Sequence, residues 1–142
     1  MTGASNQLYQ SWIDDSPFAS WLELQVLGTA HGLNAVLPFQ EKNVGNTFIR
    51  SLHGGIVSAS MECAGGLLAA NLHGLDRIQK PASISISYTR STTASDLNIS
   101  ISSIKTGKRL SFLEAQAWQD DKTKIVAVAT MTFLRKSEET QV

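Results

Sequence analysis

The chain has little cysteine and no arrangement of side chains that would hold a metal. One of its 142 residues is cysteine, Cys63, so no disulfide can form within the chain. This composition indicates a protein that folds in a reducing compartment. The three histidines, His31, His53 and His73, have no companions at the spacing of common zinc motifs. We therefore expect neither a disulfide nor a bound metal or other cofactor.

Net charge is also lacking, because twelve basic and twelve acidic residues cancel. The basic residues are scattered, which argues against strong attraction to nucleic acid or to an anionic membrane. The N-terminal stretch has no basic segment followed by an apolar run, so it does not resemble a signal peptide, and we expect a cytoplasmic protein. Residues 54–72 are long enough to span a membrane, but four glycines and several polar residues argue against insertion.

The length and composition indicate one domain over residues 1–142. A chain of this length can bury about two-thirds of its unfolded surface in a single core. Apolar residues make up 42% and charged residues 17% of the chain, a globular composition that is slightly poor in charge. Such a composition leaves room for a subunit interface, so we expect an oligomer.

Hydrophobic periodicity predicts a short helix, a pair of strands, a loop and a long helix in the first half of the chain. A short helix is expected over residues 6–13, a pair of strands over residues 22–27 and 33–37, and an irregular loop over residues 40–52. Residues 54–72 form a helix that is apolar nearly all round and therefore buried, with Gly74 as its C-terminal cap. Its paired glycines, Gly65 and Gly66, suggest close approach of a partner helix or an acyl group.

After residue 74 the pattern alternates with a period of two. Strands are expected in SISISY, in the segment starting at Leu97, in RLSFLEAQAWQ and in KIVAVATMTFL, and the tail over residues 136–142 is expected to fray. One helix buried on all sides and several one-sided strands predict an α+β fold, in which an antiparallel sheet wraps around a long central helix.

Glu62 is the one charged residue of the segment from residue 54 to 72. A carboxylate in apolar surroundings is costly to bury without a partner, which marks it as a candidate for catalysis. Nine residues earlier, His53, Gly54 and Gly55 begin the same helix, where unpaired N–H groups can stabilise an oxyanion. Gly54 and Glu62 are about 12 Å apart by helical rise, so they would act together only from two subunits across a twofold axis.

This combination points to acyl transfer to water, with Glu62 as general base or as nucleophile. The segment LHGGIVSASMECAGGLLA resembles the signature of hotdog-fold acyl-CoA thioesterases of the phenylacetate-pathway (PaaI-like) type, within the 4-hydroxybenzoyl-CoA thioesterase superfamily. The resemblance continues through SISYTRS to about residue 134. It implies a hotdog fold, a homodimer or homotetramer, and hydrolysis of an acyl-CoA at the subunit interface.

The resemblance also implies roles for individual residues. Gly54 matches the amide that polarises the thioester carbonyl, Glu62 the base or nucleophile, and His53 a positioning residue. Asn46 is the nearest match to an Asn or Gln that orients water or the carbonyl, although Thr47 occupies the position itself. The hydroxyl residue that many members carry four residues after the acid is replaced here by Gly66. Further candidates for substrate binding are Gly55, Thr47, Tyr88, Arg90 and Ser91.

Other interpretations stay open. Glu62 could serve a structural network, and Cys63 in an apolar helix is more typical of an inert residue than of a nucleophile. Arg90 could be an ordinary solvated charge or could recognise the phosphates of CoA. The main alternative is a non-catalytic hotdog module that binds an acyl or aromatic ligand.

Overall fold

The secondary structure comprises three α-helices, one 3-10 helix and eight strands within residues 3–135, the part of the chain that the computed structural model describes. The expected frayed tail lies outside this range. In chain order the elements are α1 (Gly3–Asp15), α2 (Pro17–Leu22), β1 (Gln25–Gly28), β2 (Gly32–Leu37), the 3-10 helix η1 (Glu41–Asn43), β3 (Val44–Asn46), β4 (Ser51–Leu52), α3 (Gly54–His73), β5 (Ser83–Tyr88), β6 (Leu97–Thr106), β7 (Leu110–Trp118) and β8 (Ala127–Leu134).

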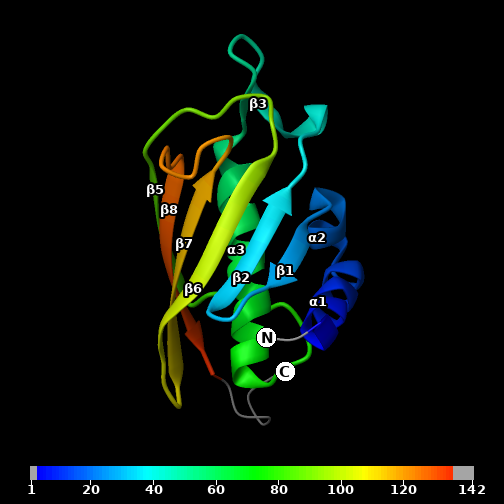
Figure 1. Ribbon diagram of the computed structural model, residues 1–142, viewed down its shortest axis with the longest axis vertical. Helices are drawn as coiled ribbons and strands as arrows, with labels where there is room; N and C mark the ends of the chain where they lie inside the picture. Colours follow the sequence, from blue (N-terminus) through cyan, green and yellow to red (C-terminus); the bar gives the residue numbers. More distant parts are fainter. Residues whose placement is uncertain (1–2, 136–142) are drawn as a thin grey trace.

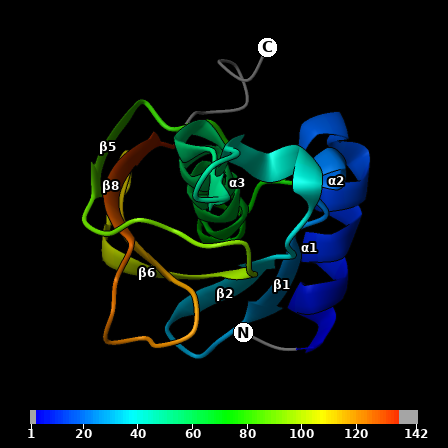
Figure 2. The same cartoon turned by 90° about the horizontal axis from the view of Figure 1, so that it is seen from above.

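Six of the strands form one antiparallel sheet in the order β1-β2-β6-β7-β8-β5. The sheet curves around α3, and α1 and α2 cover a further side of that helix (Figures 1 and 2). One sheet edge, β1, contacts α1, whereas the other edge, β5, is mostly exposed. The predicted α+β architecture, a hotdog arrangement of a sheet around a long central helix, is confirmed.

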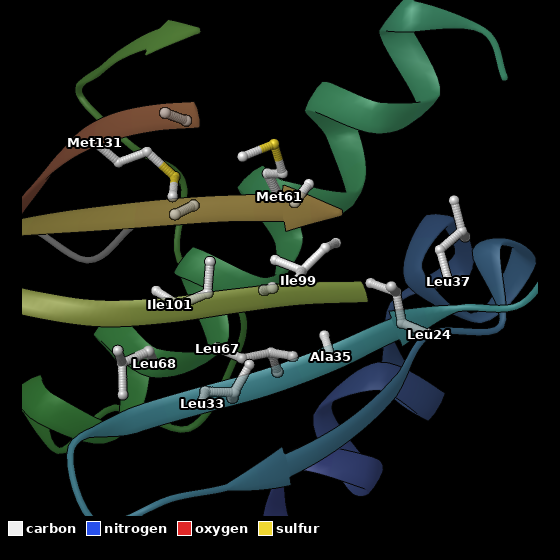
Figure 3. Packing of buried hydrophobic residues seen from close by; sticks show 14 of the residues in the cluster. Leu24, Leu33, Ala35, Leu37, Met61, Leu67, Leu68, Ile99, Ile101 and Met131 are labelled. Atoms are coloured by element: carbon white, nitrogen blue, oxygen red, sulfur yellow. The ribbon is translucent and has the colours of Figure 1, made fainter. Parts of the chain in front are cut away.

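The core lies between the sheet and α3. Along β6, Leu97, Ile99 and Ile101 are buried while the alternate residues face outward, as the period of two requires. The register places Leu33 of β2 opposite Ile101, and Leu67 of α3 packs in the same cluster (Figure 3). Burial of each such side chain contributes about 1.5–3 kcal/mol, so this contact between helix and sheet stabilises the fold.

Helix α3 has the length and composition of a membrane span, but it is the central helix of the fold. In the 18-residue window of α3 that is apolar enough for a membrane span, 61% of the residues are buried within the protein. The core helix of a soluble protein can have the same length and composition. The predicted C-terminal cap is confirmed: Gly74 is left-handed (φ 66°), and its N–H donates to carbonyl groups of the last turn. The length of α3 is therefore explained by burial against the sheet.

Two regions differ from the sequence predictions. The chain forms a second helix, α2, directly after α1, because Ser16 accepts a hydrogen bond from the N–H of Ala19 and Pro17 occupies the first helical position. The segment over residues 40–52, predicted to be an irregular loop, contains η1 and the antiparallel pair β3 and β4. Pro17 therefore begins a new helix directly after the end of α1.

The paired glycines of α3 contact other parts of the same chain, so the expected contact with a partner helix or acyl group is wrong for them. A Cβ on Gly65 would lie 2.7 Å from the sulfur of Met131, and one on Gly66 would lie 2.2 Å from the carbonyl oxygen of Gln79. The N–H of Gln79 also donates to the carbonyl of Gly66, at 3.2 Å. The connection from α3 to β5 therefore lies directly on the helix.

A buried histidine joins the end of α3 to the start of β7. His73 is 4% exposed, and its Nε2 lies 2.6 Å from the hydroxyl oxygen of Ser111. Its Nδ1 has no hydrogen-bond partner within residues 3–135. Burial lowers the pKa of His73 below its ordinary value, and the positive charge of Arg135 lowers it further. The folded protein therefore holds this side chain neutral.

This burial predicts a loss of stability in mild acid. Below about pH 6.5, His73 is protonated in the unfolded chain but takes up a proton less readily in the folded chain. The free energy of unfolding therefore falls as the pH falls through this range. Urea unfolding at pH 7 and pH 5 should show a smaller loss for His73→Gln than for the unchanged protein. The matched control is His31→Gln, an exposed position that should keep the original pH dependence. Equal losses of unfolding free energy in the unchanged protein and in both variants would show that His73 does not cause the pH dependence.

Candidate functional site

The start of α3 presents one backbone N–H without a partner. His53 is the N-cap residue, and its Nδ1 accepts a hydrogen bond from the N–H of Gly55 at 2.9 Å. The carbonyl of His53 accepts from Ile56 and Val57. Within the described chain, nothing accepts a hydrogen bond from the N–H of Gly54. His53 therefore satisfies one donor and leaves its neighbour available at the positive end of the helix dipole.

Gly54 lines a cavity of about 410 Å³. The cavity brings together four residues that the sequence singled out, namely Gly54, Tyr88, Arg90 and Ser91. The hydroxyl of Tyr88 donates to the carbonyl of Gly54 at 2.9 Å, which ties the edge strand β5 to the helix start. The remaining lining residues are Ser51, Leu52, Val57, Thr89, Thr92 and Val126.

Thr92 is a residue of this site that the sequence did not indicate. Its hydroxyl oxygen accepts a hydrogen bond from the N–H of Leu52, at 2.8 Å. The two residues are 40 positions apart, and no local pattern marks one threonine among several. The contact fixes the strand that leads into His53 against the segment that follows β5.

Glu62 lines a different cavity from Gly54. It is half-buried on α3 and borders a space of about 270 Å³ between the first two helices and the connection from α3 to β5. No described residue forms an ion pair with Glu62. Within one chain the carboxylate and the free N–H therefore belong to separate cavities, as the predicted separation of about 12 Å along the helix requires.

Cys63 next to Glu62 is not poised as a nucleophile. Burial raises the pKa of its thiol to about 11, and the negative charge of Glu62 contributes to the same shift. The thiol is therefore protonated at neutral pH, whereas nucleophilic attack needs the thiolate. The chemistry of this surface depends on Glu62 rather than on its neighbour.

Asn46 and Thr47 lie at the start of an exposed turn between β3 and β4. The side-chain oxygen of Asn46 accepts hydrogen bonds from the N–H groups of Phe48, at 3.0 Å, and Ile49, at 3.4 Å. This pattern is an Asx turn, which closes the loop locally. Neither Asn46 nor Thr47 borders the two cavities described above.

The described part of the chain contains no cluster of side chains typical of a metal-binding site. Residues 3–135 contain no group of three or more His, Cys, Asp or Glu side chains that could hold an ion. The groups available for chemistry are a backbone N–H, a carboxylate, hydroxyl groups and the guanidinium of Arg90.

Comparison with known families assigns the chain. The family model for the acyl-CoA thioesterase N-terminal domain matches residues 45–134, which is more than half of the protein. This chain belongs to the acyl-CoA thioesterase family. The match includes the helix start, Glu62 and the cavity beside Gly54, whereas α1 and α2 precede it. A search of curated sequences finds no significant match.

Solved structures of thioesterase-superfamily proteins share the hotdog fold. One thioesterase-superfamily protein is 25% identical, with a TM-score of 0.85, and the alignment covers 94% of this chain and all of that one. PaaI of the phenylacetic acid degradation operon of E. coli is 14% identical, with a TM-score of 0.77 and 94% of both chains covered. Thioesterase superfamily member 2 of Mus musculus is 17% identical, with a TM-score of 0.77 and coverage of 96% and 100%. The family and the fold expected from the sequence are thus confirmed.

Proposed function

We propose that the protein is an acyl-CoA thioesterase of the PaaI-like type, which hydrolyses the thioester of CoA or of another pantetheine to a free acid and a thiol. One observation carries the proposal. The N–H of Gly54 is left unpaired beside a cavity, while the carboxylate of Glu62 on the same helix borders a second cavity. A thioester needs both groups at its carbonyl, so the proposed site combines them from two subunits.

The exposed edge of the sheet supports a twofold dimer. Strand β5 has a neighbour on one side, and its Ile84 and Tyr88 are exposed although both are large and apolar. An unprotected strand edge is a template for pairing with another strand. Pairing of β5 with its copy would extend the sheet and bring the two α3 helices side by side in opposite directions, with Glu62 of each facing the helix start of the other. Two such dimers could pair as a tetramer.

The proposed reaction needs no cofactor. The carbonyl oxygen of the acyl group accepts a hydrogen bond from the N–H of Gly54, which stabilises the negative charge that develops on that oxygen. As a general base, Glu62 of the opposing subunit removes a proton from a water molecule, and this water attacks the acyl carbon. As a nucleophile, Glu62 attacks the acyl carbon itself, and water then hydrolyses the acyl-enzyme intermediate. In either case the bond from carbon to sulfur breaks, and the thiolate of CoA leaves and takes up a proton.

The test is a panel of short, medium, long and aromatic acyl-CoA esters, with release of free thiol followed by a colorimetric reagent. We expect turnover of at least one ester and no activity of boiled protein. Tight binding of the esters without release from any of them would instead support a non-catalytic binding module. We also propose a cytoplasmic location and no nucleic-acid or membrane partner, since the net charge is zero.

Arg90 is proposed to bind a phosphate of CoA at the rim of the Gly54 cavity. Its planar guanidinium suits phosphate oxygens, and the contact would be made equally in the ground and transition states. Arg90→Ala should therefore raise KM about tenfold and change kcat by less than about threefold. The matched control is Arg109→Ala in the turn between β6 and β7, which should change neither value. An unchanged KM in Arg90→Ala would remove this residue from the site.

A further inference from the structure

The cavity that borders Glu62 has apolar walls from three separate parts of the chain. Trp12 comes from α1, Phe18 from α2, and Ile78 from the connection between α3 and β5. Cys63, whose thiol is neutral, lies beside the carboxylate. The other lining residues, Asp15, Ser16, Asp76, Arg77, Gln79 and Lys80, are polar. Although most of the lining residues are polar or charged, most of the surface that faces the cavity is apolar, as in small-molecule pockets.

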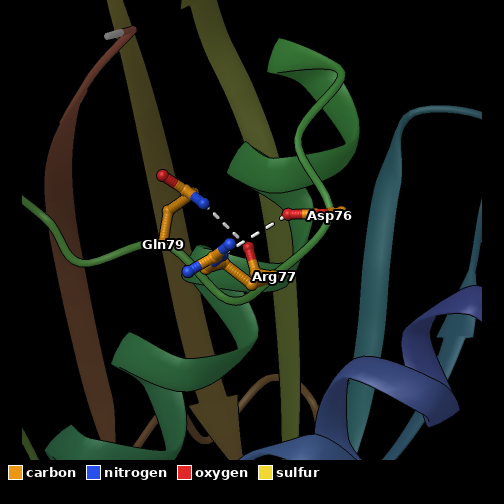
Figure 4. A network of polar contacts seen from close by, with 3 residues as sticks. All are labelled: Asp76, Arg77 and Gln79. Atoms are coloured by element: carbon orange, nitrogen blue, oxygen red, sulfur yellow. Dashed lines mark hydrogen bonds and ion pairs between the residues drawn. The ribbon is translucent and has the colours of Figure 1, made fainter. Parts of the chain in front are cut away.

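The walls of this cavity are held in place without a ligand. Trp12 is 7% exposed and packs edge-on against Tyr9, with ring centroids 5.8 Å apart. On the opposite side, the backbone of Gln79 is bonded to α3, and its side chain donates to the carbonyl of Arg77 at 2.8 Å (Figure 4). Arg77 also pairs with Asp76. The pocket is therefore largely preformed, with Trp12 anchored in the core.

We propose that this cavity, the Trp12–Phe18 pocket, receives the acyl group of the substrate and restricts it to compact acyl groups. The inference rests on the proposed function. A general base or nucleophile must lie within about 3–3.5 Å of the reacting atom, or reach it through one water molecule, so the acyl carbon must lie next to Glu62. The tail attached to that carbon then enters the apolar space that Glu62 borders. The polar nucleotide of CoA would lose its hydration there, which leaves the acyl tail as the matching part of the ester.

The size of the pocket sets the limit on the acyl group. Its volume of about 270 Å³ lies just below the range for small-molecule sites, roughly 300–1,000 Å³. We therefore expect butyryl, hexanoyl and benzoyl groups to be accommodated better than a palmitoyl chain.

Phe18 and Trp21 provide a matched pair of variants. Their rings stack on each other 6.0 Å apart on α2, and their exposed fractions are 46% and 45%. Phe18 borders the pocket, whereas Trp21 does not. Replacement of either by alanine breaks the same stacking contact, but only Phe18→Ala enlarges the pocket. Because both side chains are half-exposed, both variants should fold.

The measurement is the ratio of kcat/KM for decanoyl-CoA to that for butyryl-CoA. The unchanged protein should favour butyryl-CoA, Phe18→Ala should raise the ratio by about tenfold or more, and Trp21→Ala should leave it within about twofold. Phe18→Trp, which narrows the pocket, should lower the ratio. Equal ratios in Phe18→Ala and Trp21→Ala, or a preference of the unchanged protein for palmitoyl-CoA, would overturn the pocket assignment while leaving the thioesterase proposal intact.

Failure of the thioesterase proposal is distinguishable from failure of the pocket. If the unchanged protein cleaves no ester, titration calorimetry with butyryl-CoA compares the same variants. Weaker binding by Phe18→Ala alone would support the pocket in a non-catalytic protein, and equal binding by both variants would reject it.

Discussion

Glu62→Gln should lower kcat for the preferred acyl-CoA by about two to four orders of magnitude, the effect expected for removal of a general base or nucleophile. The amide has the shape of the carboxylate but neither takes a proton at neutral pH nor forms an acyl intermediate. Because Glu62 makes no ion pair with a described residue, the substitution should leave the fold and the oligomer unchanged. Steady-state release of thiol gives kcat, and size-exclusion chromatography checks the assembly.

Asp14→Asn is the matched control for this variant. Asp14 is an exposed carboxylate on α1 that borders neither of the two cavities, so its loss removes equal charge without changing the proposed site. We expect kcat within about threefold of the unchanged protein, because no proposed catalytic or binding group is altered. Similar losses in the two variants would indicate a general effect of charge. Full turnover by Glu62→Gln would exclude Glu62 as base or nucleophile.

Gly54→Pro should cost about two to three orders of magnitude in kcat, because proline removes the proposed oxyanion donor. The local backbone suits proline: Gly54 is the first residue of α3, and His53 before it is extended at φ −61° and ψ 129°. A Cβ at this position would meet the ring of Tyr88 at 3.7 Å, an ordinary contact. The helix should therefore start as before but without the N–H.

Gly54→Ala separates the loss of the donor from the gain of a side chain. Alanine adds the same Cβ and keeps the N–H, so kcat should fall by no more than about tenfold. Circular dichroism and thermal melting check that both variants fold. If the alanine variant were as inactive as the proline variant, steric exclusion of the carbonyl, rather than the missing hydrogen bond, would explain both losses.

The same two variants test whether each site spans two subunits. In a heterodimer of Glu62→Gln and Gly54→Pro, one site contains both changes and the other contains neither. Mixed refolding of the two inactive proteins should therefore restore activity, to about a quarter of the original for random pairing in equal amounts. No recovery, with heterodimers demonstrated by differential tags, would mean that both groups serve a site within one chain.

Much of the sheet was predictable because its strands alternate strictly. Ile84 and Ile86 of β5 face the same way, and the pattern beginning at Leu97 appears unchanged in β6. The central helix was predictable because an apolar surface on all sides requires burial. Helix α2 was missed because its six residues, which begin with a proline, are too few to display helical periodicity. Strands β3 and β4 were missed because they span three and two residues of polar sequence.

The candidate site was predictable only in part. The spacing of Gly54 and Glu62 along one helix indicated both the chemistry and the need for two subunits. The walls around Glu62 were not predictable, since Trp12 and Phe18 are more than 40 positions away in the sequence and meet it only through packing of α1 and α2. Thr92 likewise meets Leu52, 40 positions away, only in the folded chain. Local patterns identify reactive groups, whereas the shape around them comes from distant segments.

The close contact between Gly66 of α3 and Gln79 limits how the protein can be redesigned. The carbonyl oxygen of Gln79 occupies the space of any side chain at this position, so a hydroxyl residue cannot be introduced there without a change elsewhere. A serine at position 66 would displace residues 76–80 and, with them, the wall to which Ile78 belongs. The absence of a side chain at position 66 and the shape of the pocket around Glu62 are thus coupled, and an engineer must change both together.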